Sequence, residues 1–299
     1  MIAPSAPAAT IGLIGLGLMG SAFAGRLLAG GFAVLGCDID PAKREALNAL
    51  GGRGVARAQE VFQHCDRVIL SLPSHREAAQ VIAAGDGVLR PGQIVIDTTT
   101  GDPEPTAALA GVLAARGVTY LDATVSGSSA QVRGGAVTLM VGGNAAAFAQ
   151  CADVFACIGR QAFHTGAAGT GAKMKLVTNL VLGLNRAALA EGLALAESLD
   201  LNLEQTLAVM RACPAYSRIM DTKGERMIHG DFAPDARLSQ HLKDVRLIVE
   251  TGQQAGLPMP LSAAHRAVLE AAEAAGWGER DNSAIIQALR APVTRPVEP

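Results

Sequence analysis

Aromatic residues and net charge are both scarce in this sequence. Phe, Trp and Tyr make up 3% of the 299 residues, and the formal net charge at pH 7 is −2. Proteins that bind nucleic acid need a basic field to displace counterions, and those that bind exposed bases also need aromatic rings for stacking. A nucleic-acid partner is therefore not expected.

Paired cysteines and clustered histidines are also missing. The five cysteines are scattered and form no Cys-x-x-Cys pair, and no two of the six histidines lie three or four residues apart. Such spacing predicts neither a disulfide framework nor a zinc site. We therefore expect reduced cysteines and no bound metal.

No apolar run is long enough to cross a membrane. The best candidate is interrupted by Arg186, Glu191 and Glu197, whereas a spanning helix needs about 20 apolar residues. An apolar stretch near the N-terminus, residues 11–24, lacks the preceding positive charge of a signal peptide. The sequence therefore predicts a cytoplasmic protein with no membrane partner.

Glycine, in contrast, is abundant and unevenly distributed. Residues 1–171 hold 26 of the 34 glycines, and residues 172–299 hold the other 8. The first part also alternates short apolar runs with helical stretches, which predicts a mostly parallel sheet wound by crossover helices. The expected strands are Thr10–Ile14, Ala33–Cys37, Arg67–Leu72, Ile94–Asp97, Thr119–Leu121 and Thr138–Val141.

The strand signals stop after Gly171. Periodic stretches rich in Ala, Leu, Glu and Gln follow and predict helices, of which Lys173–Ser198 is long enough to link two domains. We therefore predict an α/β Rossmann domain with a doubly wound sheet over residues 1–171, joined by a long helix to an all-α domain over residues 172–299. The other expected helices are Leu203–Arg211, Leu238–Ala255 and Pro260–Ala275.

A Gly-rich turn follows the first expected strand. Gly15, Gly17 and Gly20 form a G-x-G-x-x-G motif, with Leu18 and Met19 between the last two glycines. Between a strand and a helix, such a motif lets backbone N–H groups approach a dinucleotide pyrophosphate at the helix N-terminus. The five residues are therefore predicted to bind a nicotinamide dinucleotide.

An acidic residue, Asp38, follows the second expected strand. It lies 18 residues after Gly20, where a carboxylate accepts both ribose hydroxyls of NAD and repels the 2′-phosphate of NADP. Lys43 and Arg44 are close enough in sequence to reach a 2′-phosphate. The sequence therefore favours NAD and leaves NADP open as an alternative.

A lysine and an asparagine share one face of the long helix. Lys175 and Asn179 are four residues apart, while Lys173 points about 200° away from Lys175. Their neighbours are apolar, so a buried lysine there would have its pKa lowered toward the range useful for proton transfer. The alternative is an ordinary solvated lysine, and spacing alone leaves both open.

Four motifs, in this order, resemble those of the β-hydroxyacid dehydrogenase family, which includes 3-hydroxyisobutyrate dehydrogenase and 2-hydroxy-3-oxopropionate reductase. They are the Gly-rich loop at residues 15–20, D-A-T-V-S-G-S at residues 122–128, G-T-G-A-K-M-K-L-V-T-N at residues 169–179, and K-D at residues 243–244. The resemblance implies hydride transfer between NAD(P) and a small 3-hydroxy acid or its semialdehyde. It also implies a homodimer or homotetramer formed through the C-terminal domain.

The resemblance further implies roles for individual residues. Lys175 corresponds to the general acid/base, Asn179 to a substrate ligand, and Ser126 with Gly127 to the turn that holds the substrate carboxylate. No metal is required, because a positioned base, a carboxylate-binding turn and the cofactor suffice for this chemistry. The residues that would line the nicotinamide half of the cofactor are Leu72, Pro73, Thr100 and Lys243.

Several positions depart from the family pattern. Thr124 replaces a proline, Ser128 replaces a glycine, and Gly101-Asp102 replaces Ile-Ser; these changes bear on substrate identity more than on chemistry. Thr178 stands where 6-phosphogluconate dehydrogenases have a histidine. Two other functions stay open: an imine reductase-like relative, which usually has Asp or Tyr in place of Lys175, and a non-catalytic module that senses NAD.

Overall fold

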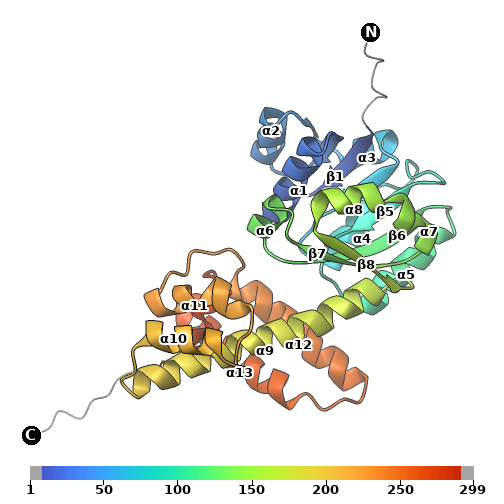
Figure 1. Ribbon diagram of the computed structural model, residues 1–299. Helices are drawn as coiled ribbons and strands as arrows, with labels where there is room; N and C mark the ends of the chain where they lie inside the picture. The colour runs from blue at the N-terminus through green and yellow to red at the C-terminus, as the bar shows by residue number, and fades with distance from the viewer. Residues whose placement is uncertain (1–8, 291–299) are drawn as a thin grey trace, which may run out of the picture. The chain divides into compact units, whose positions relative to one another are not determined.

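The computed structural model describes residues 9–290, whose elements are shown in Figure 1. Contacts within the chain divide it into two compact units, one ending at Lys175 and the other beginning at Leu176. Within the described residues the first unit is α/β and the second is helical. The predicted fold class is therefore confirmed, including the long helix, which runs from Thr170 to Ser198.

The first unit is built on one eight-stranded sheet with the order β3-β2-β1-β4-β5-β6-β7-β8. β6 and β7 are antiparallel, and all other neighbouring pairs are parallel. The chain moves outward from β1 to β3 and then returns to β4 beside β1, which creates the switch point where doubly wound sheets bind ligands. The strands are β1 (Thr10–Ile14), β2 (Ala33–Cys37), β3 (Arg53–Val55), β4 (Arg67–Leu70), β5 (Ile94–Asp97), β6 (Thr119–Ser126), β7 (Thr138–Gly142) and β8 (Gln161–Gly166).

The six inner strands occur where the sequence predicts them, with different ends in three cases: β4 ends at Leu70, β6 continues to Ser126 and β7 continues to Gly142. The two edge strands, β3 and β8, were missed. β3 has three residues, and every residue of β8 is exposed or half-buried. Because an edge strand needs no continuous apolar run, neither carries the pattern that identifies a buried strand.

Helices cover both faces of the sheet. Alternate residues of a strand point to opposite faces, and accordingly Ile69 belongs to one buried apolar cluster whereas Val68 and Leu70 belong to another. The first cluster includes side chains of α1, α2, α6, α7 and α8, and the second includes those of α3, α4 and α5. These helices are α1 (Leu18–Ala29), α2 (Pro41–Ala49), α3 (Ala58–His64), α4 (His75–Ala84), α5 (Pro103–Ala114), α6 (Ser129–Arg133), α7 (Ala145–Gln150) and α8 (Ala152–Ile158).

The second unit packs its helices around a separate apolar core that includes Leu193, Leu207 and Leu242. One of its helices, α11, was not expected, because charged residues interrupt its apolar ones. Among the described residues, no helix combines the length and the apolar content of a membrane span. The helices are α9 (Thr170–Ser198), which begins in the first unit, α10 (Leu203–Ala212), α11 (Ile219–His229), α12 (Leu238–Gln254) and α13 (Pro260–Ala272), followed by short π and 3-10 turns.

A cation is buried in this second core. Arg186 of α9 is 3% exposed, and its Nε and Nη1 atoms have no hydrogen-bond partner among the described residues. The carboxylate of Asp281 offsets part of the cost, but its two oxygens already accept hydrogen bonds from Lys223, Ser283 and backbone N–H groups. Burial consequently lowers the pKa of Arg186 to about 10.

We expect Arg186→Met to raise the free energy of unfolding by about 1–3 kcal/mol, because an apolar chain of similar length avoids burying an incompletely paired charge. Urea unfolding followed by circular dichroism measures the change. Arg218→Met, at an exposed position of the same unit, is the control and is expected to change stability by less than about 0.5 kcal/mol. A clear loss of stability in Arg186→Met would show that the guanidinium is fully compensated.

Candidate active site

The Gly-rich loop joins β1 to α1 and is packed against its own backbone. Gly15 has a φ of +94°, and a Cβ atom on it would lie 2.2 Å from the carbonyl oxygen of Ser71. A Cβ on Gly20 would lie 1.9 Å from the carbonyl oxygen of Gly15. At Gly17, by contrast, nothing lies within 4 Å of the corresponding position. The loop therefore packs tightly against neighbouring backbone at Gly15 and Gly20, whereas the space beside Gly17 is open.

The first turn of α1 presents main-chain N–H groups to that open space. Gly17 is the N-cap residue, and no side chain caps the helix there. Leu18 is mostly exposed and Met19 packs against the core, so this segment offers backbone rather than polar side chains. Because uncapped N–H groups and the helix dipole favour an anion, the loop fits a dinucleotide pyrophosphate.

Asp38, directly after β2, is fixed beside this loop. Its Oδ2 accepts the N–H of Leu16 at 2.6 Å, and its Oδ1 accepts the N–H of Asp40 at 2.9 Å. Arg44 donates from Nη1 to the carbonyl oxygens of Asp38 and Ile39, so its guanidinium is committed to the backbone. The carboxylate is therefore held in one orientation, as recognition of ribose hydroxyls requires.

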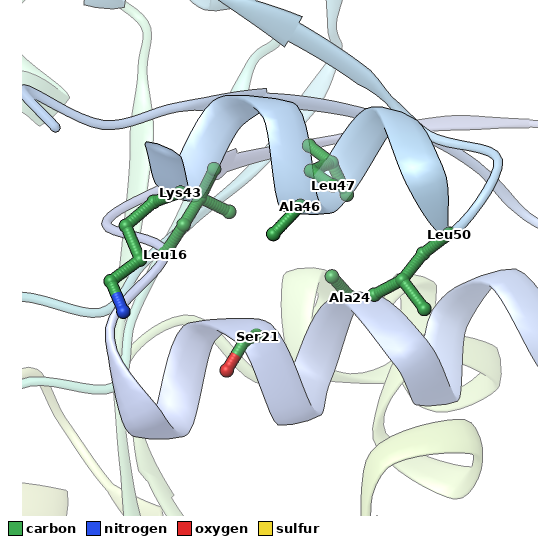
Figure 2. Close-up of a pocket in the computed structure, with 7 residues that line it drawn as sticks. All are labelled: Leu16, Ser21, Ala24, Lys43, Ala46, Leu47 and Leu50. Atoms are coloured by element: carbon green, nitrogen blue, oxygen red, sulfur yellow. The ribbon is translucent and has the colours of Figure 1, made fainter. Parts of the chain in front are cut away.

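A cavity of about 180 Å³ opens between α1 and α2, next to the Gly-rich loop (Figure 2). Its wall is largely apolar, and its two polar side chains, Ser21 and Lys43, come from the two facing helices. In Figure 2 the side chain of Lys43 extends toward the start of α1, beside Leu16. Of the two cations that the sequence placed near a 2′-phosphate, Lys43 is thus the one that borders this cavity.

The residues expected around the nicotinamide divide between the two units. Leu72 and Pro73 follow β4, and Thr100 lies shortly after β5, at the sheet edge where the Gly-rich loop follows β1. The Leu72 N–H donates to Oγ1 of Thr99 at 3.3 Å, which joins the two loops. Lys243 is half-buried on α12 of the second unit, and its role at the cofactor stays a prediction.

The start of α9 is anchored to β6. Asp122 accepts the N–H groups of Gly169 at 2.9 Å and Ala172 at 2.8 Å. Thr124 donates its hydroxyl to the carbonyl oxygen of Gly171 at 2.9 Å. The carboxylate of Asp122 therefore lies at the positive end of the helix dipole, and both anchoring side chains are buried.

Lys175 lies in the second turn of this anchored segment. Its side chain is 9% exposed, and its Nζ donates to the carbonyl oxygen of Val125 at 2.7 Å. Val125 immediately precedes Ser126 and Gly127. The ammonium group is therefore buried beside the predicted carboxylate-binding turn, and the alternative of a solvated lysine is wrong.

The turn after β6 exposes its backbone. Gly127 is exposed and has a φ of +145°, a conformation that side chains disfavour. Ser128 then begins α6 with a capping box: its N–H donates to Gln131 Oε1 at 2.8 Å, and its hydroxyl accepts the Gln131 N–H at 3.3 Å. The serine that replaces the usual glycine thus fixes the far side of the turn.

Asn179 lies one helical turn after Lys175, in the second unit. Its side chain is 6% exposed, and its Nδ2 donates to Oδ2 of Asp244 on α12 at 3.1 Å. Both members of the acid–amide pair are buried. The sequence placed Asn179 at the site but did not predict that a carboxylate would hold its amide.

Two buried carboxyl groups on neighbouring strands were also missed. Asp97 of β5 and Asp122 of β6 are register partners, and the hydroxyl of Tyr120 donates to Asp97 at 2.6 Å. Burial raises the pKa of both carboxyl groups. The available signal was an acidic residue in a buried strand, at the end of β5 for Asp97 and in the middle of β6 for Asp122. No group of three or more potential metal ligands occurs within residues 9–290.

Comparison with known proteins matches both units to described families. Residues 10–166 match the model for the NAD binding domain of 6-phosphogluconate dehydrogenase. Residues 169–289 match the model described as NAD-binding of NADP-dependent 3-hydroxyisobutyrate dehydrogenase. The two matched segments together span nearly all of the described chain.

Individual relatives extend over the same range. The chain is 34% identical over 281 residues to 2-(hydroxymethyl)glutarate dehydrogenase of Eubacterium barkeri, covering 93% of each protein. It is 32% identical to L-threonate dehydrogenase of Cupriavidus necator, covering 93% of this chain and 95% of that one. A crystal structure of 3-hydroxyisobutyrate dehydrogenase from Salmonella typhimurium is similar with a TM-score of 0.86 and 27% identity, covering 93% of this chain and 99% of the other.

We expect Gly20→Ala to lower the free energy of unfolding by about 1–3 kcal/mol and to weaken NADH binding, because the new Cβ must displace the Gly15 carbonyl. Gly25→Ala on the same helix is the matched control. Nothing lies within 4 Å of that Cβ, so it should gain about 0.5–1 kcal/mol from helix propensity. Urea unfolding and NADH fluorescence titration measure both effects. Equal behaviour of the two variants would contradict the packing described for the loop.

Proposed function

The chain belongs to the β-hydroxyacid dehydrogenase family of NAD(P)-dependent oxidoreductases that act on CH–OH groups, and from this premise we propose its substrate and the roles of its residues. The proposed reaction is hydride transfer between NAD and a small 3-hydroxy acid or its semialdehyde, of the 3-hydroxyisobutyrate or 2-hydroxy-3-oxopropionate type. The observation that carries the proposal is the buried Lys175 ammonium beside the turn at Ser126.

Lys175 moves the proton that accompanies hydride transfer. The bound dinucleotide supplies the hydride acceptor for oxidation or the hydride donor for reduction. During oxidation the neutral Lys175 amine takes the hydroxyl proton as the neighbouring C–H bond breaks, and during reduction the ammonium returns it. The hydrogen bond to the Val125 carbonyl holds Nζ in place in both states, because the amine keeps N–H groups when it loses one proton.

Ser126 and Gly127 bind the substrate carboxylate in this proposal. The exposed turn offers main-chain N–H groups together with the Ser126 hydroxyl, and such charge-assisted bonds are stronger than neutral ones. The Ser128 capping box keeps the turn from rearranging when the anion binds. A 3-hydroxy acid whose carboxylate is held there would have its C3 hydroxyl in the region of Lys175.

NAD is the preferred cofactor in this proposal. The Asp38 carboxylate is fixed by two backbone N–H groups, and its charge opposes a 2′-phosphate while its oxygens accept ribose hydroxyls. Arg44 is committed to backbone carbonyls, which leaves Lys43 as the cation for a 2′-phosphate. NADP would be used as efficiently as NAD only if the repulsion between the Asp38 carboxylate and the 2′-phosphate were removed.

The reaction is tested with a substrate panel monitored at 340 nm. The panel holds 3-hydroxyisobutyrate, 2-(hydroxymethyl)glutarate, glycerate, threonate and serine with NAD or NADP, and tartronate semialdehyde with NADH or NADPH. We expect turnover of at least one compound, faster with the NAD(H) pair. Lys175→Met should lower kcat by about 10²–10⁴-fold while NADH still binds.

Lys173→Met is the matched control, because Lys173 is exposed two residues earlier on the same helix. It should retain wild-type turnover. Full activity in Lys175→Met would contradict the role of the lysine, and tight NADH binding without turnover of any compound would favour a non-catalytic NAD-sensing module. Reduction of a cyclic imine in place of the hydroxy-acid panel would favour the imine reductase alternative, in which Asp or Tyr is usual at residue 175.

We also propose that two or more copies associate through the helical unit. Val177, Val181 and Leu195 are each more than half exposed on α9, and their spacing places them along one face of the helix. A second copy would remove this apolar line from water.

Multi-angle light scattering should give a dimer or tetramer for the wild type and a smaller species for Val181→Glu. A monomeric wild type would refute the association.

A further inference from the structure

The carboxylate of Asp244 faces one particular atom of Asn179. The Asn179 Nδ2 donates to Asp244 Oδ2 at 3.1 Å, and the two side chains are 6% and 8% exposed. A carboxylate can only accept hydrogen bonds, whereas an amide has a donating end and an accepting end of almost equal shape. The reverse orientation of the amide would press Oδ1 against a buried anion, so a single orientation is allowed.

The backbone around this pair is closely spaced. Gly183 lies one helical turn after Asn179 on α9, and His241 lies one turn before Asp244 on α12. A Cβ on Gly183 would lie 2.9 Å from His241 Nε2 and 2.7 Å from His265 Cε1. The missing side chain therefore lets α12 approach α9 closely, which holds the Asn179 and Asp244 side chains at hydrogen-bond distance.

We infer that Asp244 is a positioning residue that commits the Nδ2 end of Asn179 and thereby leaves Oδ1 to accept a hydrogen bond from a substrate hydroxyl. The inference rests on the proposed function, because it assigns Asn179 to the substrate. The negative charge of Asp244 behind the amide also opposes a carboxylate at this position. Asn179 is consequently suited to a substrate hydroxyl and not to a substrate carboxylate.

A double-mutant cycle tests the inference. Asp244→Asn keeps the shape of the side chain but permits either orientation of Asn179, so kcat/KM for the hydroxy acid should fall at least about 10-fold. If Asp244 acts through Asn179, adding Asp244→Asn to Asn179→Ala should cause less than about a 2-fold further loss. The same cycle can be measured without turnover, by calorimetric titration of the hydroxy acid into the NADH complex of each variant.

Specificity provides a readout that a merely structural role would not change. The wild type should bind 3-hydroxypropionate more tightly than malonate, in which a carboxylate replaces the CH₂OH group. Asp244→Asn should narrow this affinity ratio at least about 5-fold. In that variant the Asn179 amide can turn its N–H groups toward malonate, and the Asp244 carboxylate that repels malonate has been removed. NADH affinity should stay within about 2-fold of the wild type. Glu250→Gln, at an exposed position of α12, is the control and should leave every value unchanged.

Three outcomes would overturn the inference. They are wild-type kcat/KM in Asp244→Asn, an equal fold-loss from Asp244→Asn in the presence and absence of Asn179, and an unchanged ratio of 3-hydroxypropionate to malonate affinity. A wild-type protein that binds the hydroxy acid but turns over nothing would refute the proposed function alone, since the binding cycle still reports on Asp244. Absence of any hydroxy-acid binding would overturn both.

Discussion

The buried carboxylate of Asp122 at the first turn of α9 is the interaction on which the candidate chemistry depends. It pairs with the N–H groups of Gly169 and Ala172, so the helix begins at a fixed place on β6. The same strand contributes the Val125 carbonyl that receives Nζ of Lys175 and continues into the turn at Ser126. One strand therefore determines the spacing between the proposed proton-transfer group and the proposed anion site.

A shared physical pattern links the cofactor loop, the start of α9 and Asn179. At the cofactor loop, the first turn of α1 offers backbone N–H groups after Gly17. At the start of α9, Asp122 fixes the helix by accepting two backbone N–H groups, and on α12 Asp244 fixes the amide of Asn179. A protein with 3% aromatic residues has few rings for binding by stacking, so the proposed site would obtain its specificity from hydrogen bonds. Small polar acids suit such a site, because most of their surface forms hydrogen bonds.

The sequence predicted those parts of the fold that are visible in the spacing of apolar residues and in the positions of glycines. The six inner strands, the Gly-rich loop and the long helix all follow from local patterns. The edge strands β3 and β8 do not, because their burial is partial and no apolar period forms. Helix α11 buries one face, but Lys223 and Gly224 occupy two of its five buried positions and interrupt the apolar period. The placement of Lys175 one turn before Asn179 was readable from spacing, and its burial was not.

The partners of these side chains arise from long-range contacts that spacing cannot show. Asp122 and Ala172 are 50 residues apart, and Asn179 and Asp244 are 65 apart. Thr124 was noted only as a departure from a family pattern, yet its hydroxyl holds the Gly171 carbonyl, a bond that a proline could not make. Ser128 likewise has a reason in the structure, since it caps α6. A residue that departs from the family pattern can therefore be explained only when its hydrogen-bond partners in the structure are known.

The anchoring of α9 also concerns motion. Helix ends ordinarily fray, because their first N–H groups have no partner within the helix and open at little cost. Here the opening turn is tied to the middle of a sheet, and Lys175 lies just beyond it. Fraying of this turn is therefore opposed, and the proposed proton-transfer group keeps its place relative to β6.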